Sequence, residues 1–493
     1  MRTVRALLPF VGLFGFALVS PSAARAGEVT RIASSFEEDN PFDLHFGVAY
    51  DYNFKRASIL REWGRANGSN RLAKDLVYQQ SRQTVTPRLE IGLFHDLSLY
   101  LDVPIVVSDD RSYALDQRTE PCTFGDDVGG ATGESQADCV NKNNSSTIRD
   151  SIIPRDGFDA SAPNEAYGSF TGEDTETIFR GPTRRGVDQL YVGIKKALIN
   201  QRRYPHLPTW ILALEGRFAV GKPMRFTRDI AIDSSLTEAN EYVGRGIHEL
   251  GAWTALSHRH RFLEPYFGVH WRQGLRASGS QFKRYGDAQD KFNPMSTAGF
   301  FVGGEIIPWE RKATHQKIAL AFSGSTNLRY DGREYSEVWE LLSDSPALVG
   351  TNNPGRARCN IAAAVAHAKA NPLAHSDYLA VANQAPNSGG CSKFNGITTV
   401  QNYAEFALRV ALNVHLSSYA RLVVGANLGT TTRHFVTSAD RGDPGTTGDP
   451  DVVEAETTDV NPIRRDVIDN VGRRYAVDDM LNVRGFARFW LTF

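Results

Sequence analysis

The last eleven residues of this 493-residue chain, VRGFARFWLTF, constrain its fold more than any other stretch. Every second residue back from Phe493 is apolar or small as far as Val483, and the alternate set includes Arg484 and Arg488. A period of two is typical of a β-strand whose two faces meet different surroundings. The pattern therefore predicts a terminal strand with one face toward lipid and the other toward a polar interior. An edge strand of a soluble β-sandwich is the alternative interpretation.

The first 26 residues have the three parts of a secretory signal peptide. Arg2 and Arg5 form a positive region, residues 6–20 are largely apolar, and residues 24–26 (Ala-Arg-Ala) form a small-x-small cleavage site. We expect export by a Sec-type route and a mature chain that begins near Gly27. Removing this segment removes three arginines and no acids, so the formal charge becomes 52 − 56 = −4. This charge gives no basic footprint for nucleic acid, and we predict no nucleic-acid partner.

No apolar run of roughly 18 residues follows the signal, so the sequence predicts no membrane-spanning helix. Instead, eleven further segments show the same alternation of apolar and polar residues. They are residues 42–54, 82–93, 97–107, 188–198, 210–220, 246–256, 262–272, 299–306, 317–323, 405–414 and 421–428. With the terminal segment they make about twelve strands. The patterns at 246–256 and 299–306 are the weakest, which leaves a range of 10 to 14.

The connections between these strands alternate between very short and long. Three are especially long, at residues 109–184, 329–400 and 432–480, and they are rich in polar and acidic residues. Short periplasmic turns and long extracellular loops are typical of outer-membrane barrels. The predicted organisation is a signal peptide (1–26), a periplasmic N-terminal segment (27–40) and one barrel domain (41–493).

The chain resembles bacterial outer-membrane β-barrel proteins in three features: the signal peptide, the strand–loop alternation and the terminal Phe493. The resemblance implies an all-β, antiparallel, up-and-down transmembrane barrel in the bacterial outer membrane. It also implies contact with outer-membrane lipid and lipopolysaccharide, and recognition of the final strand by the barrel-assembly machinery. It reaches no specific family, so it carries over no functional residue and leaves the oligomeric state open.

Charged residues recur on the strand faces opposite the apolar set and are predicted to point into the barrel. The lumen-lining candidates are Arg82, Arg88, Glu90, Asp102, Lys195, Glu215, Arg217, Glu249, Glu264, Glu305, Lys317, Glu405, Arg409, Arg421, Arg484 and Arg488. One interpretation is a channel or transporter that passes small solutes through a narrow polar lumen. The alternative is a structural or surface-interaction barrel whose charges pair and fill the interior, because an unpaired buried charge is costly.

An outer-membrane hydrolase is a third, less favoured interpretation. Outer-membrane phospholipases and proteases resemble this architecture and carry catalytic groups near the barrel rim. His248, His270, Asp109 and Asp110 are the residues that could serve here, but no motif supports catalysis. We therefore predict that the chain is not an enzyme.

Four cysteines fall in two nearby pairs, Cys122 with Cys139 and Cys359 with Cys391. Each pair lies within one long loop, and in an exported chain this spacing predicts two local disulfides. The acidic residues of the third loop, Asp440, Asp443, Asp449 and Asp451, lack the spacing of an EF-hand. The sequence therefore predicts neither a metal site nor a cofactor.

Overall fold

The computed structural model describes residues 27–37, 42–64, 70–116, 140, 145–150, 152–153, 177–226, 240–284, 289–343, 345–348, 394–442, 461 and 463–493. The signal peptide, the four cysteines and the aspartates of the third loop beyond residue 442 lie outside these ranges. The predicted cleavage and the two predicted disulfides therefore stay predictions. Within the described ranges, no cluster of three or more His, Cys, Asp or Glu side chains could hold a metal ion. No helix in those ranges has the length and apolar character needed to cross a membrane.

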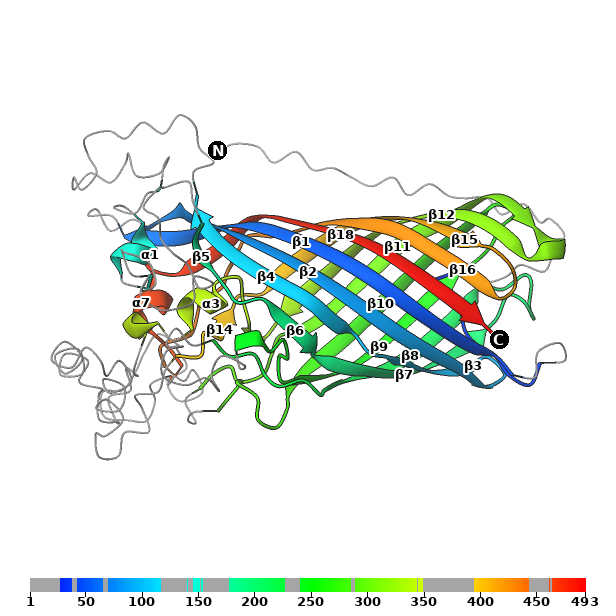
Figure 1. Ribbon diagram of the computed structural model, residues 1–493, viewed down its shortest axis with the longest axis horizontal. Helices are drawn as coiled ribbons and strands as arrows, with labels where there is room; N and C mark the ends of the chain where they lie inside the picture. The colour runs from blue at the N-terminus through cyan, green and yellow to red at the C-terminus, as the bar shows by residue number, and fades with distance from the viewer. Residues whose placement is uncertain are drawn as a thin grey trace.

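Long antiparallel strands form a closed barrel, because β1 pairs both with β2 and with the last strand, β18 (Figure 1). The barrel strands are β1 (Leu44–Gly64), β2 (Asn70–Phe94), β3 (Leu97–Asp102) continued by β4 (Ile105–Leu115), β6 (Arg184–Val187) continued by β7 (Gln189–Ile199), β8 (Thr209–Ala219), β9 (Ile247–Ser257), β10 (Leu263–Arg276), β11 (Ser296–Arg311), β12 (Gln316–Tyr330), β15 (Tyr403–His415), β16 (Ala420–Thr431) and β18 (Tyr475–Thr492). Counting each continued strand once gives the predicted twelve, and the barrel fold is confirmed.

The seam between the first and last strands is complete to the end of the chain. Phe493 donates its backbone N–H to the carbonyl of Leu44 at 2.8 Å, and Leu44 donates to the carbonyl of Phe493 at 3.0 Å. Closure matters because an open strand edge in hydrocarbon would leave backbone groups without partners, each at a cost of several kcal/mol. The terminal strand predicted from alternation is therefore the element that closes the barrel.

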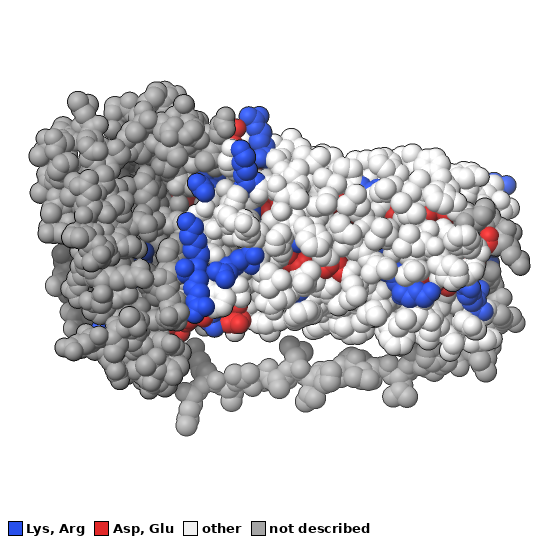
Figure 2. All heavy atoms as spheres, turned by 90° about the horizontal axis from the view of Figure 1, so that it is seen from below, with Lys and Arg blue, Asp and Glu red and all other residues white. Residues whose placement is uncertain are grey.

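The outer face of the barrel is apolar. On β15, Leu408 and Val410 are 66% and 55% exposed, while Arg409 between them points inward and contacts the ring of Phe486 on β18. Figure 2 shows that the visible flank of the barrel carries few acidic or basic side chains along most of its length. The predicted lipid-facing set is the exposed set, which is the arrangement of a bacterial outer-membrane β-barrel.

Several strands extend farther toward the loop end than the alternation predicts. The alternation predicts strands at 42–54 and 82–93 with a connection between them, but β1 runs to Gly64 and β2 begins at Asn70. The reason is that the inward face changes from polar to apolar there, so that Ile59 and Leu76 are fully buried in a hydrophobic core. Residues 57–62 of β1 and 75–78 of β2 are all buried, so the alternation is lost at these ends and they do not line a polar lumen.

Short elements from the long loops complete this core and gather at the loop end of the barrel (Figure 1). They are α1 (Ser146–Arg149), β5 (Thr177–Arg180), β13 (Gly332–Glu334), α3 (Trp339–Leu342), η4 (Pro346–Leu348), β14 (Thr398–Val400), β17 (His434–Phe435) and α7 (Asp466–Asp469). A further short helix, η3 (Lys312–Thr314), lies in a periplasmic turn. We call the loop-end assembly the loop cap.

Candidate functional site

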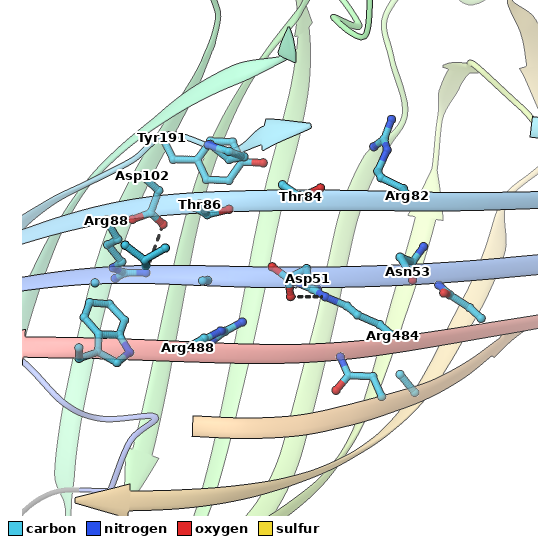
Figure 3. Close-up of a pocket in the computed structure, with 18 of the residues that line it drawn as sticks. Asp51, Asn53, Arg82, Thr84, Thr86, Arg88, Asp102, Tyr191, Arg484 and Arg488 are labelled. Carbon is cyan, nitrogen blue, oxygen red and sulfur yellow. Dashed lines mark hydrogen bonds and ion pairs between the residues drawn. The ribbon is translucent and has the colours of Figure 1, made fainter. Parts of the chain in front are cut away.

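A cavity of about 500 Å³ lies inside the barrel, against the inner faces of β1, β2 and β18 (Figure 3). We call it the central chamber. Its charged lining residues are Asp51, Arg82, Arg88, Asp102, Arg484 and Arg488. Polar side chains such as Asn53, Thr84 and Tyr191 fill the spaces between them. The lining therefore carries four guanidinium groups and two carboxylates, an excess of positive charge.

Three of the four arginines have carboxylate partners. Arg484 donates from Nε to Asp51 at 2.8 Å, and Figure 3 shows the two side chains pointing toward one another. Arg88 donates to Asp102 at 3.2 Å. These pairs come from neighbouring strands, where the register places opposite charges side by side.

Arg82 donates to Asp109 at 2.7 Å, and Arg111 donates to the same carboxylate at 3.0 Å. Asp109 is completely buried and lies beyond the chamber lining. Arg488 differs from the other three arginines because it has no carboxylate partner among the described residues; its buried Nε also lacks a hydrogen-bond partner, as do the Nε atoms of Arg82 and Arg88. Its guanidinium lies 5.1 Å from the ring centre of Phe486. The chamber thus contains a cationic group that is free to attract an anion.

The remaining lumen candidates fall into groups that the sequence could not separate. Glu90, Lys195, Glu305, Arg409 and Arg421 surround a smaller cavity of about 230 Å³ that also borders Arg88 and Arg488. Glu215 and Glu249 lie 2.6 and 3.6 Å from Arg217. Lys317 lies 3.7 Å from Glu305, and Glu264 on β10 is the register partner of Glu305 on β11. Glu405 accepts a hydrogen bond from the side-chain amide of Asn327 at 3.3 Å. Five of the sixteen candidates line the central chamber: Arg82, Arg88, Asp102, Arg484 and Arg488.

The periplasmic end of the lumen holds residues 27–35, which we call the N-terminal plug. The sequence places residues 27–40 in the periplasm, but Glu28 forms an ion pair with Arg421 at 2.6 Å inside the barrel. Ala33 donates to Glu90 at 3.1 Å, and the hydroxyls of Thr30 and Ser257 lie 2.6 Å apart. The plug was not foreseen because a short polar segment carries no periodic signal, and its partners lie far away in the sequence.

The opposite end of the lumen is covered by the loop cap, with Trp339 at its centre. Trp339 is fully buried and donates from its ring nitrogen to the carbonyl of Asn395 at 2.8 Å. Arg184, also fully buried, lies over the ring and donates from Nε to Glu340 at 3.0 Å. In α7, another part of the loop cap, burial raises the pKa of the Asp469 carboxyl to about 6. Together, the N-terminal plug and the described part of the loop cap narrow the lumen at both ends.

The residues considered for a hydrolase have separate partners. Asp109 is held by Arg82 and Arg111, and His248 accepts the backbone N–H of Ala219 at 3.1 Å through Nδ1. Asp110 instead accepts the Thr183 hydroxyl at the exposed surface. Among the described residues, no hydrogen bond joins either histidine to either aspartate. The contacts of these residues therefore have structural roles, and no acid–base pair of histidine and aspartate is formed among them.

Comparisons with known proteins assign no function to this chain. No family model matches the sequence, and no curated protein sequence matches it. Similar solved structures include an outer-membrane channel from Pseudomonas putida F1, with 9% identity, a TM-score of 0.37, and coverage of 95% of this chain and 100% of that chain. The outer-membrane protease OmpT from Escherichia coli is 7% identical, with a TM-score of 0.26 and coverage of 94% and 100%. A Pseudomonas aeruginosa FadL homologue is 6% identical, with a TM-score of 0.28 and coverage of 91% and 90%.

Proposed function

We propose that this protein is an outer-membrane channel for small anionic solutes. The observation that carries the proposal is the central chamber, with its excess of arginine over aspartate and the unpaired Nε of Arg488. In a narrow pore with low-dielectric walls, a ring of one charge raises the local concentration of the opposite ion. A volume of about 500 Å³ accommodates one small solute with some water.

Replacing Arg488 with glutamine should reduce this preference for anions. The change removes one positive charge from the chamber but keeps a polar side chain at this position. We expect the reversal potential of the purified protein in planar bilayers, under a salt gradient, to shift toward cations. The matched control is Arg311→Gln, which removes an exposed arginine next to a periplasmic turn, outside the chamber. Equal reversal potentials for wild type and Arg488→Gln would refute the role given to the chamber.

A filled, non-conducting barrel is the second candidate, and the narrowing of the lumen at both ends favours it. The plug pairs with lumen charges from the periplasmic end, and the loop cap packs a hydrophobic core at the other end. A barrel of this kind would show no single-channel steps and no ion selectivity. The bilayer measurement therefore separates the two candidates.

We also propose that the outer rim binds phosphate groups of lipopolysaccharide. Basic side chains gather where the apolar flank meets the loop end (Figure 2). Exposed members in the described residues include Arg185 on β6, Arg225 after β8, and Arg276 at the end of β10. Arginine favours phosphate because its planar donors match two oxygens at once.

Replacing Arg185, Arg225 and Arg276 together with glutamine should lower the lipopolysaccharide that remains bound through purification. The effect follows from the loss of three charges at the level of the lipid headgroups. The phosphate content of the purified protein, measured by mass spectrometry, checks it. As a control, three exposed basic residues of the periplasmic turns, Arg202, Arg311 and Lys312, can be replaced with glutamine together. If both triple variants retain as much lipopolysaccharide as wild type, the arginines of the rim do not bind its phosphate groups.

A further inference from the structure

Two glutamate carboxylates occupy directly opposed positions on neighbouring strands inside the barrel. Glu264 on β10 pairs directly with Glu305 on β11 in the strand register, and their side chains are buried almost completely. Carboxylates at directly opposed positions repel each other and destabilise a sheet. Lys317, 3.7 Å from Glu305, supplies one positive charge. One oxygen of each glutamate, Oε2, has no hydrogen-bond partner among the described residues. The pair therefore has room, in charge and in free acceptors, for another cation.

The start of the N-terminal plug lies on this pair. The backbone nitrogen of Gly27 donates to Oε1 of Glu264, and the nitrogen of Glu28 donates to Oε1 of Glu305 at 2.9 Å. The approach is so close that a Cβ atom on Gly27 would lie 2.6 Å from the Glu264 oxygen. A side chain at position 27 would therefore force the Glu264 carboxylate to move away from this nitrogen.

We propose that Glu264 and Glu305 form a binding site for a primary ammonium group, and that its ligand is the amino terminus of the chain itself. Residue 27 is the position where the sequence predicts the mature chain to begin. A signal-removing protease would hydrolyse the Ala26–Gly27 peptide bond with one water molecule. The hydroxyl goes to the Ala26 carboxyl group and a proton to the Gly27 nitrogen.

Cleavage changes what the Gly27 nitrogen can offer to the two carboxylates. An amide nitrogen is neutral and has a single N–H donor, whereas an α-amino group, with an ordinary pKa of about 7.7–8.0, is largely a cation at neutral pH. An ammonium group has three donors, enough to reach Oε1 of Glu264 and the oxygens that lack partners. With Lys317, the ammonium brings two positive charges to two negative ones. Removal of the signal peptide would thus fix the plug in the lumen.

This inference does not depend on the solute that the barrel passes, and its test involves no conductance. The full chain is exported with its own signal, purified in detergent, and its amino terminus identified by mass spectrometry. We expect Gly27 as the first residue. The folded and unfolded protein are then treated with a reagent selective for α-amino groups. Labelling of the folded protein should be at least about tenfold slower than labelling of the unfolded protein. One charge-assisted hydrogen bond to the amine is enough to provide this factor.

A matched pair of variants separates the carboxylate site from simple burial. Glu264→Gln keeps the shape of the side chain but removes its charge, and we expect labelling of the folded variant to approach the unfolded rate. Glu405→Gln removes a lumen carboxylate that contacts Asn327 on another part of the wall, and we expect wild-type protection. Heat-modifiable gel mobility shows whether each variant has folded. If Glu264→Gln does not fold, Glu305→Gln, which removes the charge of the other carboxylate of the pair, takes its place in the comparison.

Three outcomes would overturn the proposal. The first is a mature amino terminus at a residue other than Gly27. The second is a wild-type amine that reacts equally fast in the folded and unfolded protein. The third is equal protection in wild type and folded Glu264→Gln, which would mean that burial alone shields the amine.

Discussion

Deleting residues 28–35 is expected to raise the single-channel conductance of the barrel several-fold. These residues make up most of the N-terminal plug, and they place side chains such as Glu28 and Arg31 inside the narrow periplasmic half of the lumen. Without them, water should reach Glu90, Arg421 and the floor of the central chamber. The barrel itself should persist because its strand ladder closes without the plug. Planar-bilayer recordings of the refolded deletion variant and wild type measure the change.

Phe36→Ala is the control for this deletion. Phe36 follows the plug at the periplasmic rim, where its side chain is 63% exposed and its ring lies 6.0 Å from the ring of Phe94. Its removal alters the edge of the barrel but leaves residues 27–35 in the lumen, so conductance should stay at the wild-type value. Unchanged conductance in the deletion variant would place the narrowest section of the pathway at the loop cap instead.

Replacing Glu340 with alanine should destabilise the loop cap by about 3–5 kcal/mol, the cost of leaving a buried charge without its partner. Glu340 and Arg184 are both fully buried, and two nitrogens of Arg184 lie 2.9–3.0 Å from Glu340 Oε1. The guanidinium retains backbone acceptors, including the carbonyl of Tyr242 at 3.1 Å, but these carry no full negative charge. Urea titration followed by limited proteolysis of the loop end measures the loss.

Glu241→Ala provides the surface counterpart. Glu241 pairs with Arg185 at 3.2 Å, but the two side chains are 44% and 70% exposed. Exposed ion pairs contribute about 0–1 kcal/mol because water screens them. Proteolysis of this variant should therefore occur at nearly the wild-type urea concentration. Similar behaviour of the two variants would show that the buried pair does not hold the cap together.

The strand alternation predicted the barrel because lipid imposes one demand on every strand. A lipid-facing residue such as Leu408 must be apolar, and its neighbour Arg409 can be polar only on the inner side. This local rule is visible in a single sequence. The upper part of β1 obeys a different rule, since Ile59 faces a protein core inside the barrel. Residues 57–62 are all buried, so the period of two disappears there and the sequence pattern ends the strand too early.

The site was less predictable because it depends on register and on distant contacts. Alternation alone gave Arg82, Arg484 and Arg488 as inward residues, but only the pairing of β1 with both β2 and β18 brings them around one chamber. The contact between Gly27 and Glu264 joins residues 237 positions apart. No pattern within one strand contains that information.

The length of β1 determines where a solute first meets the protein. Residues 55–64 continue the strand beyond the part with the lipid-facing pattern, and at 3.2–3.4 Å per residue they add roughly 30 Å of chain. Even with the tilt of barrel strands, this raises the loop cap well above the hydrocarbon surface. A molecule that approaches from outside therefore encounters the loop cap before it comes near the bilayer. Any discrimination among molecules begins at that elevated rim.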